Sequence, residues 1–198
     1  MSKPSRRRDF LRDTLLVAAG VTTGSVMTSD WFSALPVATG AQNAGATAEA
    51  RLRELDIALP AVPTPVAVYV PAVLSGKMLY TSGTGPRQAD GTYLSGKVGK
   101  DMSVEEGYEA ARLVGLNVLS SIRNTLGSLD RVVRLVKVLG MVNCTADFTK
   151  QPQVINGFSE LMVAVFGEEN GKAARSAVGM NALPSNIPVE IEAIFEVR

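Results

Sequence analysis

Residues 103–127 read SVEEGYEAARLVGLNVLSSIRNTLG, and this stretch decides the class of the fold. Ser103 and Glu106 have the spacing of a capping box, in which each side chain bonds the backbone N–H of the other residue. Gly127 is the residue type that most often follows the last turn of a helix. Between these two signals, side chains recur at spacings of three and four, as on one face of a helix. These side chains are Val104, Tyr108, Ala111, Gly115, Val118 and Ile122. The stretch therefore predicts one long helix with one face turned to a core.

The segments around this helix have the patterns of several strands and one more long helix. Ser75-Gly76 separates two runs rich in β-branched and aromatic residues, so a hairpin is expected there. Two helices on one side of a mixed β-sheet make an α+β fold. The expected elements are a short helix over 51–59, strands over 67–74, 77–82 and 93–98, the helix over 103–127, a strand over 131–142, a helix over 152–166, and strands over 174–183 and 189–197.

The composition excludes several kinds of chemistry. The 198 residues contain no histidine and one cysteine, Cys144. Without histidine, the chain lacks the base of Ser-His-Asp and Cys-His mechanisms and a common ligand of zinc. A single cysteine neither closes an intramolecular disulfide nor holds an iron–sulfur cluster. Any chemistry therefore uses Arg, Lys, Asp, Glu, Tyr, Ser or backbone groups.

Residues 1–48 differ in charge from the rest of the chain. They carry five cations and three acids, whereas residues 49–198 carry 15 cations and 16 acids. A basic start, an apolar run from Leu15 to Val26 and a stretch of small residues are typical of a cleavable export signal. The alternative is a membrane anchor, but the apolar run is too short for a bilayer about 30 Å thick. We expect residues 1–48 to be a signal peptide with a spacer, and residues 49–198 to form one domain.

The sequence Arg7-Arg8-Asp9-Phe10-Leu11-Arg12 resembles the twin-arginine (Tat) export signal. This resemblance implies that the Tat translocase exports the folded protein to the periplasm, with no stable membrane insertion after cleavage. Cleavage is expected between about Ala41 and Glu49, where small residues alternate with others. Three positions fit, after Ala41, Ala46 or Ala48, and the sequence leaves the choice open.

Three charged residues stand inside apolar strand patterns near the C-terminus. Arg175 begins one strand, and Glu190 and Glu192 lie two apart in the next, so both glutamates point to one face. In one interpretation this is a solvated face on which Arg175 pairs with a glutamate. In the other, the guanidinium holds the carboxylate of a ligand by two hydrogen bonds, and a nearby glutamate acts as a general acid or base. The spacing alone favours neither interpretation.

The same part of the chain resembles a known family. The segments ARSAV at 174–178, Leu183-Pro184 and VEIEA at 189–193 are similar to the C-terminal motif of the RidA/YjgF family. Its members are reactive-intermediate imine deaminases, also labelled endoribonuclease L-PSP. The resemblance covers residues 62–198, and departures from the usual residues indicate a divergent branch. The positions that match the family's site, in chain order, are Tyr69, Ser82, Asn156, Arg175 and Glu192.

The resemblance implies both an assembly and a site. The implied fold is that of the trimeric chorismate mutase, in a homotrimer with sites at the subunit interfaces. Arg175 would bind the carboxylate of a 2-imino or 2-keto acid, and Glu192 would activate or position water. Tyr69, Ser82 and Asn156 would line the pocket.

The implied reaction is hydrolysis of a reactive enamine or imine, such as 2-aminoacrylate or 2-iminobutanoate, to a 2-keto acid and ammonia. It uses no metal and no cofactor. Two other functions stay open, namely a non-catalytic or chaperone-like trimer that binds a small carboxylate in the same cleft, and an endoribonuclease. The net charge of −1 over residues 49–198 argues against a nucleic-acid partner, since neutralising phosphates supplies most of the affinity for RNA.

Overall fold

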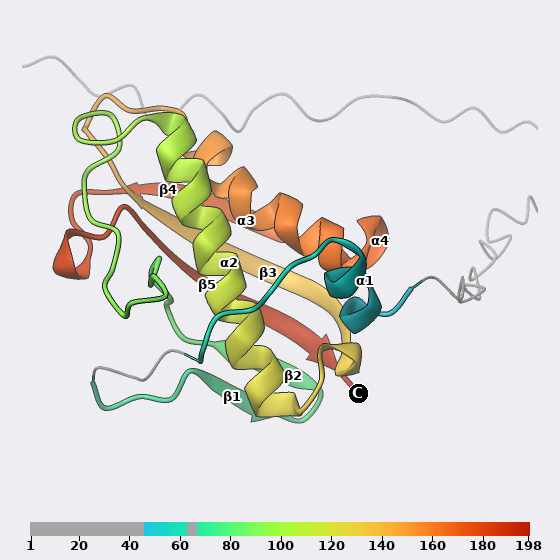
Figure 1. Cartoon of the computed structure of the whole chain (residues 1–198). Helices are drawn as coiled ribbons and strands as arrows, with labels where there is room; N and C mark the ends of the chain where they lie inside the picture. The colour runs from blue at the N-terminus through green and yellow to red at the C-terminus, as the bar shows by residue number, and fades with distance from the viewer. Residues whose placement is uncertain (1–45, 63–66) are drawn as a thin grey trace, which may run out of the picture. The chain divides into compact units, whose positions relative to one another are not determined.

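The computed structural model describes residues 46–62 and 67–198. Figure 1 shows a twisted β-sheet with its long helices lying across one face. Within the described residues, no helix is both long enough and apolar enough to cross a membrane. The export signal expected from the sequence lies almost wholly in residues 1–45, which are outside the described part.

The sheet has five strands in the order β1-β2-β5-β3-β4. Strands β3 and β4 pair in parallel, and the other neighbouring pairs are antiparallel, so the sheet is mixed as predicted. The predicted hairpin at Ser75-Gly76 joins β1 to β2. The strand bounds are Ala72–Ser75 for β1, Met78–Thr81 for β2, Val132–Asn143 for β3, Ala174–Met180 for β4 and Val189–Val197 for β5.

The opening helical prediction is confirmed by α2, which spans Val104–Leu126. Ser103 and Glu106 form both bonds of the capping box, and Gly127 ends the helix at φ 82°. Helix α3 spans Gln151–Phe166, and two short helices, α1 at Ala48–Glu54 and α4 at Glu168–Gly171, accompany it. Short 3₁₀ turns occur at Leu129–Arg131 and Pro184–Asn186.

The core lies between the long helices and the sheet. Along β5, residues alternate between buried and more exposed from Val189 to Val197, so one face of the strand packs beneath the helices. The two helices approach closely at Gly157, where an added Cβ would overlap the backbone oxygen of Tyr108. This close approach fixes the position of α3 over the sheet, and α3 carries residues of the candidate site.

The prediction of a strand over 93–98 is wrong. This segment makes only isolated bridges, such as that between Val98 and Cys144, and the chain turns at Gly96 with φ 143°. Isolated backbone bonds, such as that from the N–H of Val98 to the carbonyl oxygen of Asn143, and one lysine side chain hold it in place instead of a continuous ladder. Lys97 Nζ donates to Asn143 Oδ1 at 2.6 Å and to the carbonyl oxygen of Asn181 at 2.7 Å. The periodicity of the sequence carries no sign of these long-range bonds.

Smaller differences occur at the ends of elements. The strand predicted over 67–74 begins only at Ala72, and that predicted over 174–183 ends at Met180. The helix predicted over 51–59 begins earlier, because Thr47 caps it by accepting the N–H of Ala50, and it ends earlier, at Glu54. Helix α4 is a further turn that the sequence did not indicate.

The sheet face without helices is partly apolar. The register aligns Val73, Tyr80, Ile194, Lys137 and Ala174 in one row across all five strands. Val73 is 52% exposed and Tyr80 is 44% exposed, although both are large apolar side chains. Exposed apolar side chains on a sheet, such as Val73 and Tyr80 here, are typical of a surface that another chain covers.

Candidate functional site

Arg175 lies on β4, at the edge of the sheet, with its guanidinium against α3. Nη1 donates to Oδ1 of Asn156 at 2.9 Å and to Oγ of Ser159 at 3.0 Å. These two acceptors lie three residues apart on α3, and therefore on one face of that helix. Nη2 is 3.5 Å from the carbonyl oxygen of Pro152, whereas Nε–H has no partner among the described residues. We call Arg175, Asn156 and Ser159 the Arg175 group.

The charge of Arg175 is not neutralised within the subunit. None of the ion pairs among residues 46–62 and 67–198 includes it, so the pairing with a glutamate that one interpretation of the sequence required is not made there. Partial burial lowers the pKa of the guanidinium, but an arginine remains charged at physiological pH. The group thus presents a positioned cation with hydrogen-bond donors to spare, which suits a carboxylate ligand.

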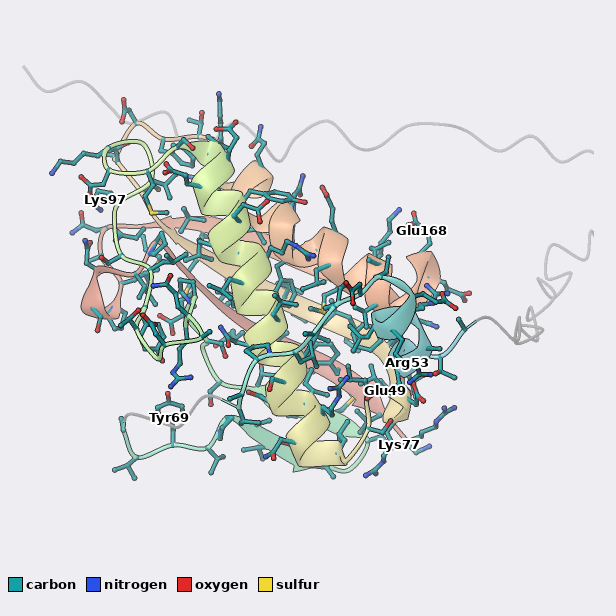
Figure 2. The ribbon with its side chains drawn as sticks, viewed as in Figure 1. Glu49, Arg53, Tyr69, Lys77, Lys97 and Glu168 are labelled. Carbon is teal, nitrogen blue, oxygen red and sulfur yellow. The ribbon has the colours of Figure 1, made fainter. Side chains whose placement is uncertain are left out.

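Ser82 and Tyr69 line a small pocket at the opposite edge of the sheet, beyond the end of β2. Ser82 Oγ donates to the carbonyl oxygen of Val70 at 2.6 Å, and its N–H donates to that of Pro71 at 2.9 Å. These bonds tie the chain before β1 to the end of β2. Figure 2 shows Tyr69 on this segment, on the far side of the molecule from α1. The pocket encloses about 30 Å³.

A glutamate fills the space beside this pocket. An added Cβ at Gly83, which lines the pocket, would overlap Oε1 of Glu190, so only glycine leaves room for that carboxyl group. Glu190 is partly buried, whereas Glu192 is exposed. Loss of water, and then the charge of Glu192, raises the pKa of Glu190. Tyr69, Ser82, Gly83, Glu190 and Arg87, which also lines the pocket, are called here the Ser82 group.

The residues predicted to form one site therefore fall into two groups in the subunit. Strands β2 and β4 are separated by β5 and β3, which makes three strand spacings, or about 14 Å. A small 2-imino acid is much shorter than this distance. Asn156 lies beside Arg175 as expected, and Tyr69 lies with Ser82, but one subunit does not bring the two groups together.

The register separates Arg175 from Glu192 as well. Val138 of β3 pairs with Arg175, whereas its neighbour Leu139 pairs with Glu192. Paired residues share a face of a sheet and successive residues alternate between faces. Arg175 therefore points to the helix side and Glu192 to the other side. Within a single subunit these two side chains do not share a face of the sheet.

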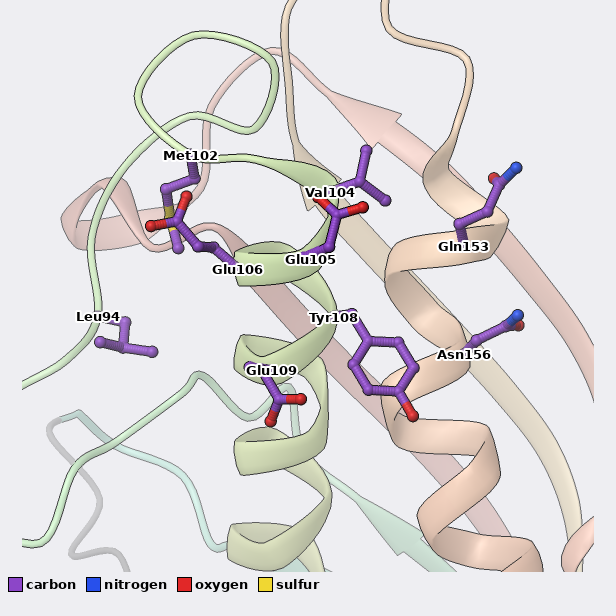
Figure 3. Close-up of a pocket in the computed structure, with 9 residues that line it drawn as sticks. All are labelled: Leu94, Met102, Val104, Glu105, Glu106, Tyr108, Glu109, Gln153 and Asn156. Atoms are coloured by element: carbon purple, nitrogen blue, oxygen red, sulfur yellow. The ribbon is translucent and has the colours of Figure 1, made fainter.

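A larger hollow, of about 750 Å³, lies around the N-terminal part of α2 (Figure 3). Its lining includes three carboxylates, which repel a ligand that itself carries a carboxylate. Of the Arg175 group only Asn156 is among its lining residues, and neither Arg175 nor Glu190 is. We therefore place the candidate site at the Arg175 and Ser82 groups. The lining residues are Leu94, Met102, Val104, Glu105, Glu106, Tyr108, Glu109, Gln153 and Asn156.

Besides Gly83, three residues of these groups were not among the predicted site residues. Ser159 could have been found, because it follows Asn156 by three positions in a predicted helix and so shares its face. Arg87 had no such signal, since it lies in a loop that only the fold places beside Tyr69. Glu190 differs from Glu192 only in its packing. Among the described residues, no group of three or more Cys, Asp or Glu side chains could hold a metal ion.

Comparisons with known proteins agree with this fold. Residues 49–192 match the family model described as "YjgF/chorismate mutase-like, putative endoribonuclease". The chain is 44% identical over 149 residues to Protein TCP17 of Trypanosoma cruzi, covering 75% of this chain and 93% of the relative.

Solved structures give the same result. The protein Atu1372 of Agrobacterium tumefaciens is 41% identical with a TM-score of 0.69, covering 77% of this chain and 94% of its own. A protein of Shewanella oneidensis MR-1, described as a putative endoribonuclease, is 30% identical with a TM-score of 0.72, and the match covers 76% of this chain and 99% of that protein. RidA of Psychrobacter sp. PAMC 21119 is 26% identical with a TM-score of 0.50, and the match covers 69% of this chain and 94% of that protein. This chain therefore belongs to the YjgF/RidA-like family.

Proposed function

We propose that the protein hydrolyses reactive 2-imino acids, such as 2-iminobutanoate or 2-aminoacrylate after tautomerisation, to 2-keto acids and ammonia. The observation that carries this proposal is Arg175, a half-buried cation held by Asn156 and Ser159 and left without an acidic partner. A small carboxylate is a ligand that a guanidinium binds well, because two parallel N–H groups reach its two oxygens. Family membership supports the reaction class, since one similar structure is described as RidA.

The separation of the two groups requires a site shared between copies. Arg175 is three strand spacings, or about 14 Å, from the end of β2 that leads to Ser82 of the same subunit. A second copy packed on the helix-free sheet face would bring its Ser82 group to the Arg175 edge. That face has exposed apolar side chains, including Val73 and Tyr80, which a stable contact between copies would bury. We propose a homotrimer, in which each of three equivalent clefts is made by two subunits.

In this cleft Arg175 would fix the carboxylate of the substrate, which places C2 of the iminium beside the glutamate of the neighbouring subunit. Glu190 is the favoured proton carrier, because its raised pKa brings it closer to neutral pH. Its carboxylate accepts a proton as water attacks C2, giving a carbinolamine. It then returns the proton to nitrogen, and the C–N bond breaks as the C=O bond forms. The departing ammonia takes the hydroxyl proton, so one iminium and one water yield one keto acid and one ammonium ion.

The test follows keto-acid release from freshly generated 2-iminobutanoate, with variants of three glutamates on one face of β5. Glu190→Gln is expected to lower kcat by about 10²-fold or more, the usual contribution of a general acid or base. Glu196→Gln is the matched control at the far end of the strand and should leave the rate unchanged. A large loss with Glu192→Gln and none with Glu190→Gln would assign the proton transfer to Glu192 instead. No acceleration by the wild-type protein would refute the deaminase proposal.

Two other functions remain as outcomes of the same assay. If keto acids bind and the wild-type protein does not accelerate hydrolysis, the cleft is a carboxylate-binding site without catalysis. The family description also names an endoribonuclease. RNA cleavage that survives Arg175→Gln, in a preparation free of other nucleases, would support that activity. The described residues carry 15 cations and 16 acids, which gives no electrostatic preference for RNA.

We also propose that the protein is exported by the Tat translocase and works in the periplasm. The support is the sequence at Arg7 and Arg8 together with the basic, apolar and small-residue order of residues 1–48. Replacing both arginines by lysine should leave the precursor in the cytoplasm. Normal periplasmic accumulation of this double variant would refute the route.

The described residues favour one of the three cleavage positions. Cleavage after Ala46 or Ala48 would fall at the start of α1, where Thr47 caps the helix and Glu49 binds Arg123. A peptidase needs its substrate extended, and the position after Ala41 is the one of the three that lies several residues before α1 and its cap, so we propose cleavage there. The mature protein is expected to begin at Gln42, which N-terminal sequencing would determine. A mature chain beginning at Thr47 or Glu49 would contradict this choice.

A further inference from the structure

The Ser82 group contains a cation that the proposed reaction does not use. Arg87 lines the small pocket together with Tyr69 and Ser82, and it is partly buried. Its Nη2 lies beside Gly91, at 3.0 Å from the position of an added Cβ there. None of the ion pairs among the described residues includes Arg87. The pocket thus has a positive side chain in its wall and no acid bound to it.

The loop that carries Arg87 is held by many hydrogen bonds. The N–H of Leu94 donates to the carbonyl oxygen of Pro86 at 3.1 Å, and the N–H of Gln88 donates to that of Thr92 at 2.8 Å. Asn117 of α2, which is 1% exposed, donates from Nδ2 to the carbonyl oxygen of Arg87 at 3.0 Å. The backbone of Arg87 is therefore anchored to a buried side chain of the core.

Asp90, the acid in the same loop as Arg87, accepts hydrogen bonds within its own turn. Asp90 Oδ1 accepts the N–H of Thr92 at 2.9 Å and its hydroxyl at 2.7 Å. These hydrogen bonds are the main cause of the lowered pKa of Asp90, and the charge of Arg87 is the smallest contribution. Asp90 is thus held away from ion-pair contact with Arg87, which leaves the guanidinium available to a ligand.

We infer that Arg87 is a specificity-determining residue that selects substrates with a second acidic group, namely 2-imino dicarboxylates. This inference rests on the proposed function. Arg175 of one subunit binds the carboxylate next to the imine, and Arg87 of the other subunit binds the distal carboxylate. The pocket encloses about 30 Å³, which suits a small polar group such as a carboxylate and is too small for a whole substrate. A rigid loop favours such selection, because little side-chain and backbone freedom is lost on binding.

The first test measures binding of the stable keto acids 2-oxoglutarate and 2-oxobutanoate by calorimetry to the purified mature protein. The wild-type protein is expected to bind 2-oxoglutarate about tenfold more tightly, the effect of one further charge-assisted hydrogen bond. Arg87→Gln should remove this preference, so that the ratio of the two affinities falls from about ten to about one. Arg87→Lys should keep part of it, since lysine retains the charge and loses the fork.

Arg53→Gln is the matched control, because Arg53 is an exposed arginine on α1, far from Tyr69 in Figure 2. It removes the same charge and should change neither affinity. Equal affinity of the wild-type protein for the two keto acids would overturn the inference, and so would a preference that survives Arg87→Gln.

The second test separates this inference from the proposed function. It compares hydrolysis of 2-iminoglutarate and 2-iminobutanoate, generated in the assay from the corresponding amino acids by an oxidase. A higher kcat/KM for 2-iminoglutarate that falls about tenfold in Arg87→Gln supports both proposals. Hydrolysis of both imines with no preference would overturn the selective role of Arg87 and keep the deaminase. A preference for 2-oxoglutarate that depends on Arg87, with no hydrolysis of either imine, would keep the selective pocket and refute the deaminase.

Discussion

Replacing Arg175 tests whether its fork binds the carboxylate of the substrate. The guanidinium has five N–H donors, of which Nη1 uses two on Asn156 and Ser159 and Nη2 directs one toward Pro152. Nε–H and one N–H of Nη2 remain, and these two lie on the same edge of the guanidinium. That edge is able to hold both oxygens of one carboxylate.

The expected loss follows from these two bonds. Removing a hydrogen bond to a charged group costs roughly 1.5–3 kcal/mol, and the partly open edge of β4 favours the low end of that range. Arg175→Gln should therefore lose about 3 kcal/mol of ligand binding, or roughly 150-fold in affinity. Arg175→Lys keeps the charge without the fork and should lose roughly tenfold. Ser159→Ala removes one support of the guanidinium and should lose only about two- to fivefold.

The assay is calorimetry with 2-oxobutanoate, followed by kcat and KM for 2-iminobutanoate. Thermal unfolding of each variant checks that the fold is retained, and Arg53→Gln is the control for loss of charge. The expected order of loss is Arg175→Gln, then Arg175→Lys, then Ser159→Ala. If Arg175→Gln binds the keto acid as tightly as the wild-type protein, the carboxylate lies elsewhere. If Arg175→Lys loses as much affinity for 2-oxobutanoate as Arg175→Gln, the charge at position 175 does not contribute to binding and the reasoning fails.

Three further predictions concern stability and assembly. Glu190→Gln should be more stable than the wild-type protein at about pH 8, and this difference should vanish below about pH 4. Because the pKa of Glu190 is higher in the folded state than in the unfolded state, the stability of the wild-type protein falls as the pH rises through these two pKa values. Denaturant unfolding at the two pH values would show this, and a less stable variant at pH 8 would contradict it. Tyr80→Asp puts a charge among the exposed apolar side chains of the helix-free sheet face, so light scattering should find the mass of one copy instead of three, and hydrolysis should be lost. An intact trimer would place the interface elsewhere. Arg123→Ala breaks the two-bond pair with Glu49 and should lower the melting temperature by about 2–6 °C, whereas an unchanged value would show that α1 is not anchored there.

Local signals were sufficient for most elements of the fold. The capping box at Ser103 and the glycine at 127 place α2 correctly, because both act within one turn of the helix. The prediction over 93–98 failed because isolated backbone bonds and the Lys97 side chain hold this segment against distant residues, including Asn143 and Asn181. Such bonds depend on which distant segments lie together, and a pattern within ten residues does not contain that information.

The candidate site was predictable in its residue types and not in its arrangement. Arg175 stood out as a cation in an apolar strand, and its neighbour on α3 was expected at Asn156. The choice between Glu190 and Glu192 depends on the contact of Glu190 with Gly83, which joins two strands distant in sequence. Arg87 lies in a loop whose place beside Tyr69 depends on the same packing.

The sequence by itself determined the elements, the kinds of chemistry available and the presence of a cation suited to a carboxylate, because these depend on composition and on spacing along the chain. Only the tertiary structure decided that Arg175 and Ser82 lie at opposite edges of the sheet, and that Arg175 and Glu192 point to opposite faces. Strand order and register set these relations. They result from burying one face of every strand beneath two helices at once, which is a property of the whole packed subunit.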